Sequence, residues 1–350
     1  LLGTRRWSEI GALVDRLRDG RGQGPQGGQV PRQVLSLPGE RLLSGDDDTA
    51  RAARQGDSAY LKIADGCSAP CAFCAIPYIK GPAVSRPLSA VVADAVDLVQ
   101  QGVKEIILIA QDTTAYGRDR GERDALPGLL QAILDAAPDL GWLRLMYAYP
   151  GHVSPELIEV MASDLRVCRY LDLPLQHAHP DVLRRMKRPA NVDRTRELIA
   201  DLRAAMPDIA LRTSFIVGYP GETEEEFGTL LEFVEESRFD RVGVFLYSPE
   251  AATAAAALPD PVPEEIKEQR YERLMGIQQT ISAEINQAQV GRTLDVLVEG
   301  QGEGLSAGRS YRDAPEIDGL VLIPGELPAG VMLPVQITGA MEYDLVGEVV

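Results

Sequence analysis

The chain has 350 residues, of which 45% are hydrophobic and 25% charged, and its formal net charge is −17 at pH 7. These proportions are typical of a globular protein, and the acidic balance argues against nonspecific binding of nucleic acid. No apolar run reaches the roughly 18 residues that suggest a membrane span. Four cysteines, three of them clustered, do not form a secreted disulfide framework. We therefore expect a protein of the reducing cytoplasm without a membrane partner.

The N-terminal segment is expected to be mostly irregular. Residues 5–18 have the pattern of a short helix, and the Gly-, Gln- and Pro-rich stretch at 20–29 is typical of a flexible linker. Residues 44–57 are charged and poor in large apolar side chains, which predicts a mobile loop. Because the chain opens without an initiator Met or a signal segment, we expect it to begin inside a longer protein.

From residue 59 onward, short apolar runs alternate with longer amphipathic stretches. The expected strands are Ala59–Ala64, Glu105–Ala110, Leu143–Tyr147, Tyr170–Leu173, Ala210–Val217 and Val242–Tyr247, and the expected helices lie near 88–101, 126–137, 154–164, 192–206 and 224–237. Strand followed by helix, repeated about six times, predicts an α/β domain with a parallel sheet and crossover helices. Two helix starts are also signalled locally, by Ser154 as N-cap and by a capping box of Thr223 with Glu226.

The last part of the chain has a different pattern. A long helix is expected over about 263–287, after a proline-rich stretch. Beyond it, short apolar runs are separated by Gly and Pro turns, which predicts a small all-β unit, most simply an OB-like barrel. We place the domain boundaries at 1–55, 56–285 and 286–350.

Three of the four cysteines, Cys67, Cys71 and Cys74, fall within ten residues after the first expected strand. Three thiolates can hold a 4Fe-4S cluster and leave one iron open to a substrate or cofactor. Structural zinc requires four ligands, and no fourth Cys or His lies within about sixty residues. Zinc is therefore the weaker alternative, followed by unpaired structural thiols. The remaining candidates are better explained otherwise, as a buried free cysteine for Cys168 and as ordinary polar residues for His152, His177 and His179.

The cysteine stretch and several later segments together resemble the methylthiotransferase branch of the radical S-adenosylmethionine superfamily. The segments are YLKIADGCSAPCAFCAIPYIKGPAVSRP, GVKEIILIAQDTTAYG, YLDLPLQHAH, RTSFIVGYPGETEEEF, FDRVGVFLYSPE and GRSYRDAPEIDG. The likeness spans roughly residues 30–350 and is greatest to the enzymes that methylthiolate the β-carbon of an aspartate in the twelfth protein of the small ribosomal subunit.

This resemblance implies a partial (β/α)6 TIM-like radical S-adenosylmethionine barrel followed by a TRAM domain. It also implies two cofactors, a 4Fe-4S cluster on the three cysteines and S-adenosylmethionine, and an electron donor such as a flavodoxin or ferredoxin. Full-length members carry an N-terminal domain with three further cysteines for a second cluster, and this chain contains none of these. Residues 1–18 are therefore expected to be the tail of that domain, and 1–55 its remnant with the linker.

Ligands of α/β folds bind at the carboxyl ends of the strands, where this sequence places several polar residues. With the resemblance added, the candidate cofactor-binding residues are Phe73, Gln111, Asp112, Gln176, Arg212 and Gly218. Each polar candidate also has a simpler interpretation. Gly218 would serve a tight turn, Gln176 would close a strand and Asp112 would cap a loop. No catalytic residue is assigned.

Charge favours a protein substrate over the nearest alternative, a tRNA adenosine methylthiotransferase that shares the core motifs. Residues 288–350 contain three basic and ten acidic residues, a balance of −7. RNA docking rests largely on Lys and Arg, so direct nucleic-acid binding is not expected, whereas a basic ribosomal protein is a suitable partner. The acidity could also serve solubility alone. A hypothesis from another class is a non-catalytic iron–sulfur or zinc-binding scaffold, which formation of 5′-deoxyadenosine would exclude.

Overall fold

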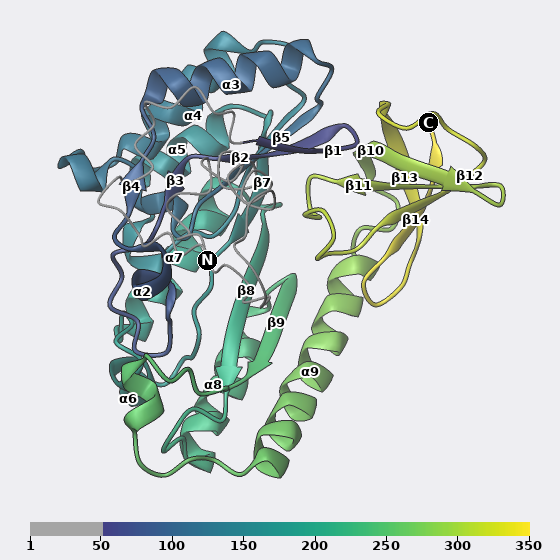
Figure 1. Cartoon of the computed structure of the whole chain (residues 1–350). Coiled ribbons are helices and arrows are strands. Elements are labelled where there is room, and N and C mark those ends of the chain that lie inside the picture. The colour runs from purple at the N-terminus through teal and green to yellow at the C-terminus, as the bar shows by residue number, and fades with distance from the viewer. Residues whose placement is uncertain (1–51) are drawn as a thin grey trace, which may run out of the picture.

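The computed structural model describes residues 52–350, which form a sheet domain and a small C-terminal barrel joined by a long helix (Figure 1). The helix expected at 5–18, the linker at 20–29 and most of the loop at 44–57 lie outside the described residues. Among the described helices, none combines the length and the apolar character needed to cross a membrane.

The sheet domain contains six parallel strands in chain order, each followed by a helix. The strands are β2 (Ser58–Lys62), β5 (Glu105–Ile109), β6 (Trp142–Leu145), β7 (Val167–Asp172), β8 (Ala210–Val217) and β9 (Arg241–Leu246). The helices are α3 (Leu88–Gln100), α4 (Ala125–Ala136), α5 (Pro155–Ser163), α7 (Val192–Ala205), α8 (Glu224–Ser237) and α9 (Glu264–Gln287). The sheet does not close, so the predicted partial (β/α)6 barrel is confirmed.

One expectation is wrong, because part of the segment predicted as a mobile loop forms an edge strand. Residues Ala52–Gln55 form β1, which pairs antiparallel with β2. Most of its side chains are exposed, so the strand is held by backbone pairing and carries no apolar signal. Several short elements were also not predicted, because each spans at most six residues: α2 (Ile76–Lys80), α6 (Pro180–Arg185) and the ribbon of β3 (Ala64–Asp65) with β4 (Val84–Ser85).

The local helix signals are confirmed. The Ser154 hydroxyl accepts a hydrogen bond from the backbone N–H of Leu157, and Thr223 with Glu226 forms a complete capping box at the start of α8. Cys168 is buried within β7, and burial raises the pKa of its thiol to about 12. It is therefore an inert core cysteine, as expected.

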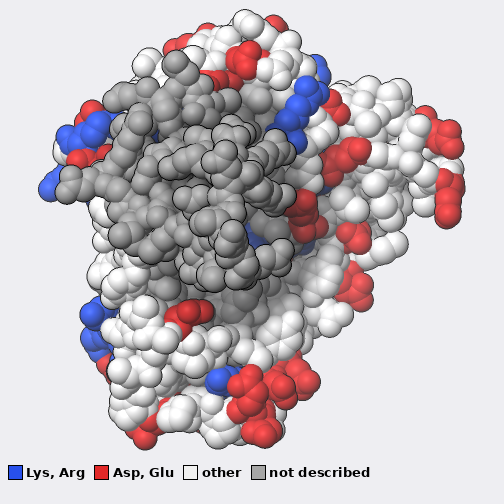
Figure 2. All heavy atoms as spheres, in the orientation of Figure 1, with Lys and Arg blue, Asp and Glu red and all other residues white. Residues whose placement is uncertain are grey.

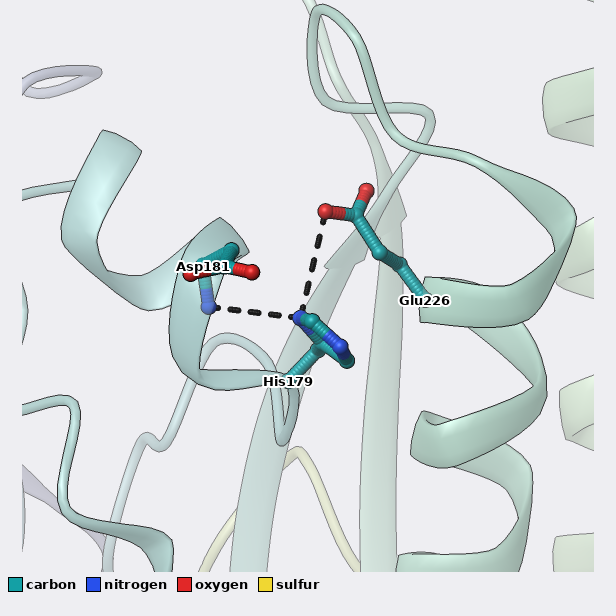
Figure 3. A group of neighbouring side chains, drawn as sticks. All are labelled: His179, Asp181 and Glu226. Carbon is teal, nitrogen blue, oxygen red and sulfur yellow. Dashed lines mark hydrogen bonds and ion pairs between the residues drawn. The ribbon is translucent and has the colours of Figure 1, made fainter.

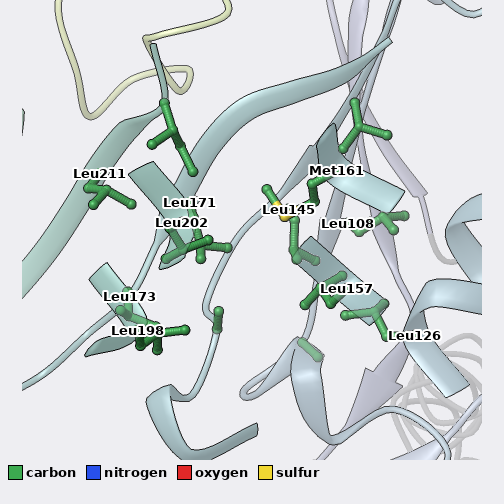
Figure 4. Close-up of a cluster of buried hydrophobic side chains, with 14 of the residues drawn as sticks. Leu108, Leu126, Leu145, Leu157, Met161, Leu171, Leu173, Leu198, Leu202 and Leu211 are labelled. Atoms are coloured by element: carbon green, nitrogen blue, oxygen red, sulfur yellow. The ribbon is translucent and has the colours of Figure 1, made fainter. Parts of the chain in front are cut away.

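Side chains on one face of the sheet pack under the helices and form the main core (Figure 4). Leu108, Leu145 and Leu171 come from three neighbouring strands and are fully buried. They meet apolar residues of the crossover helices, among them Leu157 of α5 and Leu202 of α7. Because strand side chains alternate, the residues between them point to the opposite face of the sheet.

The C-terminal domain is a closed five-stranded barrel, as the OB-like prediction requires. Its strands are β10 (Thr293–Gly302), β11 (Leu305–Ser310), β12 (Val321–Pro324), β13 (Met332–Ala340) and β14 (Leu345–Val349). The order around the barrel is β10-β11-β12-β14-β13. Val296, Val321, Ile323 and Val335 fill its interior.

The C-terminal barrel covers the second face of the sheet at the amino ends of the strands. Glu105, the first residue of β5, is fully buried and binds two arginines. Arg144 of β6 approaches its carboxylate at 2.7 Å and Arg309 of β11 at 2.6 Å. Arg144 also donates hydrogen bonds to the carbonyls of Tyr311 and Ser310. The ion pair is thus shared between the two domains.

Further buried ion pairs join the same surfaces. In each, an arginine and a carboxylate come from opposite domains: Arg241 with Asp313 at 3.0 Å, and Arg312 with Asp240. Asp318 of the C-terminal barrel accepts a hydrogen bond of 2.7 Å from the Tyr170 hydroxyl. The segment GRSYRDAPEIDG, residues 308–319, therefore forms a polar plug at the foot of the half-open sheet.

Replacing Glu105 by Gln is expected to lower the free energy of unfolding by about 3–5 kcal/mol, because two buried guanidinium groups lose their shared counter-ion. Burial alone would raise the pKa of Glu105, but Arg144 and Arg309 outweigh it and lower this pKa to about 2. The stabilisation is thus present above pH 4.5, the ordinary value, and is lost as the pH falls towards 2.

Urea unfolding at several pH values measures this effect. The difference between the wild type and E105Q should narrow as the pH falls below 4.5. The exposed Glu303 provides the matched control, since E303Q should change stability by no more than about 0.5 kcal/mol. Equal stability of E105Q and wild type at neutral pH would contradict the role assigned to this ion pair.

Candidate functional site

The three clustered cysteines line one cavity of about 170 Å³ near the carboxyl ends of the parallel strands. Their loop is positioned by backbone contacts. The N–H of Cys67 donates to Gly81, and the N–H of Ala72 donates to Met186. Gly66 starts the loop with φ of +73°, and a Cβ there would lie 2.2 Å from the carbonyl oxygen of Pro82. Glycine is therefore required at the point where the chain turns towards the cavity.

The structure brings four of the six candidate cofactor-binding residues to this cavity. Phe73, Gln111, Asp112 and Gln176 all line it, together with the three cysteines. Gln176 has φ of +76°, and its backbone bonds to Ser214 and Ile216 of β8 hold it in place. Left-handed backbone at a residue other than Gly is strained, and such strain is concentrated at functional sites.

Several cavity residues were missed by the sequence analysis. Tyr147, Tyr149 and Arg188 line the same space. Tyr147 also has a left-handed backbone, with φ of +59°. Its place at the carboxyl end of an expected strand was a usable signal. Arg188 follows the short helix α6 and carried no signal, because only tertiary packing brings it to the cysteine loop.

The other two candidates, Arg212 and Gly218, do not line the cavity. Alternation along β8 turns Arg212 towards the C-terminal barrel, where it lies 2.7 Å from Asp172 and 3.7 Å from Asp318. Gly218 packs against helix α9, and a Cβ at this position would lie 2.2 Å from Cγ of Lys267. The structure thus gives Arg212 an interdomain contact and Gly218 a packing role.

Asp112 combines the two roles considered for it. It caps the short 3-10 helix η2 (Thr113–Ala115) by accepting from the N–H of Ala115, and its carboxylate faces the cavity. Its other oxygen lies 3.0 Å from Nδ1 of His152. A second cavity of about 320 Å³ adjoins the first and shares Cys67, Ala69, Asp112 and Tyr149 with it. The cysteine loop therefore lines both cavities.

His177, next to Gln176, is not among the residues that line the cysteine cavity. It is buried, and desolvation lowers its pKa to about 3. Its Nε2 lies 3.8 Å from Glu222, whose own pKa burial raises to about 7. Arg270 binds the other oxygen of Glu222 at 2.8 Å. This group ties the loop after β8 to helix α9 and supports the site from outside.

The spacing of the cysteine sulfurs fits an iron–sulfur cluster more readily than a mononuclear zinc site. Within residues 52–350, one group of three His, Cys, Asp or Glu side chains has ligand atoms that all lie within 4.8 Å of one another. This group is His179, Asp181 and Glu226 (Figure 3). The three cysteine sulfurs are not so close, whereas tetrahedral zinc with bonds of about 2.3 Å holds its sulfurs about 3.8 Å apart. Soft thiol donors set wider apart around one cavity fit a four-iron cluster, whose ligands stand at separate corners.

The trio in Figure 3 is explained by its neighbours. Glu226 is the capping-box residue of α8 and also binds Arg185 at 2.8 Å. Asp181 pairs with Arg184, and the His179 ring accepts from the N–H of Asp181 at the start of α6. These ion pairs and helix caps explain why the three side chains lie close together, and no metal ion is needed to explain it.

Comparison with known proteins agrees with the geometry. A family model described as the radical SAM superfamily matches residues 61–234, and one described as a TRAM domain matches residues 290–350. The ribosomal protein uS12 methylthiotransferase RimO of Chloroflexus aurantiacus is 51% identical over 361 residues, which cover 99% of this chain and 78% of the relative. The protein of that name from Roseiflexus sp. is 50% identical, with 100% and 77% covered.

This chain belongs to the family of ribosomal protein uS12 methylthiotransferases. It is a radical S-adenosylmethionine enzyme, so its cofactors are an iron–sulfur cluster and S-adenosylmethionine. Among solved structures, the radical S-adenosylmethionine methyltransferase TsrM of Kitasatospora setae is similar, with a TM-score of 0.47 and 18% identity, and the match covers 74% of this chain and 43% of that chain.

Replacing Cys71 by Ala is expected to abolish binding of the cluster, because two thiolates cannot hold it at this exposed cavity. Cys168→Ala should leave the iron content unchanged, since this thiol is buried in β7 away from the cavity. Iron and sulfide analysis after anaerobic reconstitution measures both. One tightly bound zinc per chain, unaffected by reconstitution, would contradict the assignment.

Proposed function

We propose that Cys67, Cys71 and Cys74 hold one 4Fe-4S cluster, and that this chain provides the radical step of an enzyme that methylthiolates the β-carbon of an aspartate in ribosomal protein uS12. One observation carries this proposal. Three free cysteines line a single cavity at the carboxyl ends of the parallel strands, in a chain about half identical to proteins named for that reaction. A cytoplasmic location follows from a ribosomal substrate, and we assign the electron transfer to a flavodoxin or ferredoxin.

The residues of the cavity would position S-adenosylmethionine and exclude water. When bound, the cluster supplies the electron that cleaves the sulfonium of S-adenosylmethionine. The amide of Gln111 and the strained Gln176 offer hydrogen bonds to the polar groups of this cofactor, and the Asp112 carboxylate suits its amino group. Phe73 and Tyr149 supply apolar walls. Water-excluding walls protect a radical from side reactions, which is the usual contribution of the protein in cofactor chemistry.

The surface of the C-terminal barrel supports a basic protein as substrate. Arg309 and Arg312 are buried in ion pairs with the sheet domain, and Arg309 also pairs with Glu299 of the barrel itself. The exposed acidic residues of this barrel are Asp295, Glu299, Glu303, Glu316, Glu326, Glu342 and Glu348. Figure 2 shows such residues at the edge of the barrel. The exposed surface thus has a higher proportion of acidic to basic residues than the composition of the barrel. We infer that residues 286–350 dock the substrate and that residues 56–285 form the catalytic core.

Given S-adenosylmethionine and a strong reductant, the reconstituted chain is expected to form 5′-deoxyadenosine, and Cys74→Ala should form none above background. Complete methylthiolation is not expected from these 350 residues. A second cluster needs three further thiolates, and the fourth cysteine, Cys168, is buried. Chromatography of the nucleoside and mass spectrometry of uS12 measure the two steps. A cluster-loaded chain that leaves S-adenosylmethionine intact contradicts the proposal. Repeated turnover to methylthiolated uS12 contradicts the expectation that a second cluster is needed for complete methylthiolation.

The full chain is expected to bind uS12 and not a tRNA anticodon stem-loop, with an affinity that falls as salt rises. Replacing Glu326, Glu342 and Glu348 by Gln should weaken binding about tenfold at low salt, mainly through slower association.

The matched control carries the same change of charge on the outer helices, at the exposed Glu156, Glu159 and Glu232. Binding titrations at two salt concentrations should show little effect of this second triple variant. Tighter binding to the stem-loop than to uS12 would transfer the assignment to the tRNA-modifying branch.

A further inference from the structure

One cation of the cavity has no counter-ion. Arg188 lies just after α6, is partly buried and lines the cavity of the cysteines. Its Nη1 lies 3.7 Å from Sγ of Cys71. The two preceding arginines differ, because Arg184 pairs with Asp181 and Arg185 with Glu226. Among residues 52–350, no carboxylate forms an ion pair with Arg188, and its buried Nε has no hydrogen-bond partner.

The guanidinium of Arg188 is held in a fixed position. It lies 4.2 Å from the ring centroid of Tyr149, and its Nη2 donates to the carbonyl of Pro174. The backbone N–H of Arg188 donates to Leu183, and the same turn receives a hydrogen bond from Ala72 through Met186. The cysteine loop and Arg188 are therefore attached to one turn, and the side chain is aimed at a ligand sulfur by stacking and hydrogen bonding.

A partly buried guanidinium without a carboxylate is costly unless an anion stands beside it. Three cysteine thiolates with a cluster form such an anion, and its charge becomes more negative when an electron enters. Hydrogen bonds to the sulfurs and nearby charge are two of the factors that set the potential of iron–sulfur clusters. A cation at Cys71 therefore favours the reduced state.

We infer that Arg188 raises the reduction potential of the cluster through its hydrogen bond and charge at the Cys71 sulfur. The inference rests on the proposed cluster at Cys67, Cys71 and Cys74. It makes Arg188 a tuning residue that controls how readily the electron donor loads the cluster. The rest of the turn supports this role, since Tyr149 and Pro174 fix the guanidinium and leave one of its edges directed at the sulfur.

The test is a redox titration, followed by electron paramagnetic resonance, of the reconstituted full chain without S-adenosylmethionine. R188Q, with the iron content of the wild type, should be about tenfold harder to reduce, which corresponds to a midpoint potential about 59 mV lower for one electron. R188K keeps the charge and should show a smaller decrease. R184Q removes an exposed positive charge from the neighbouring helix α6 and should leave the potential unchanged.

A cluster-loaded R188Q with the wild-type potential overturns the inference, even if its affinity for S-adenosylmethionine falls, because Arg188 would then bind that cofactor alone. If R188Q does not retain the cluster, the inference is tested by the reduction potentials of Y149L and R188K. Loss of the stacking ring should lower the potential less than R188Q would, and unchanged potentials in both variants overturn the inference. A wild-type chain that binds no cluster refutes the proposed function itself, before any variant is compared.

Discussion

Glu105 lies fully buried at the foot of the sheet, between Arg144 of its own domain and Arg309 of the C-terminal barrel. A carboxylate in such a place is tolerated only if both of its oxygens are bound, and here two guanidinium groups and the hydroxyl of Ser58 bind them. The arginines in turn donate to backbone carbonyls of the segment that crosses from the barrel. Ser58 and Arg144 bind the two oxygens from within the sheet domain, whereas Arg309 of the barrel reaches this carboxylate only when the two domains dock.

This docking decides which end of the half-open sheet is available for chemistry. The plug at 308–319 occupies the amino ends of the strands, and the pair of Arg212 with Asp172 lies above it. The backbone N–H of Tyr147 donates to that same Asp172, and Tyr147 itself lines the cavity of the cysteines. The buried ion pairs thus extend from the domain interface to a residue that lines the cysteine cavity. Strained backbone at Tyr147 and Gln176 lies at this boundary, where the structure around it can hold the strain.

The same ion pairs shape the outer surface. They bury Arg309 and Arg312, which are two of the three basic residues in 288–350, while seven acidic residues remain exposed on the barrel. The same residues therefore stabilise the docking of the two domains and set the surface charge on which the proposed substrate docking depends. If these arginines were exposed to solvent, the barrel would attract a basic partner less strongly. It would also repel the phosphates of RNA less.

The sequence alone determined the order of strands and helices, the barrel class of the C-terminal unit and the group of three cysteines. These follow from local patterns: apolar periodicity over six strand–helix units, caps such as that of Thr223 with Glu226, and cysteines within ten residues of one another. The edge strand β1 was missed because it is held by backbone pairing and buries little.

Tertiary structure alone decided which distant side chains meet. It placed Arg188 beside Cys71, 117 positions away in the chain, and turned Arg212 to the ion pairs between the domains. The face to which a strand residue points depends on register, and the partner of a charge depends on how the domains dock. Neither is encoded in the spacing of neighbouring residues, because both arise from contacts that form only when the chain has folded.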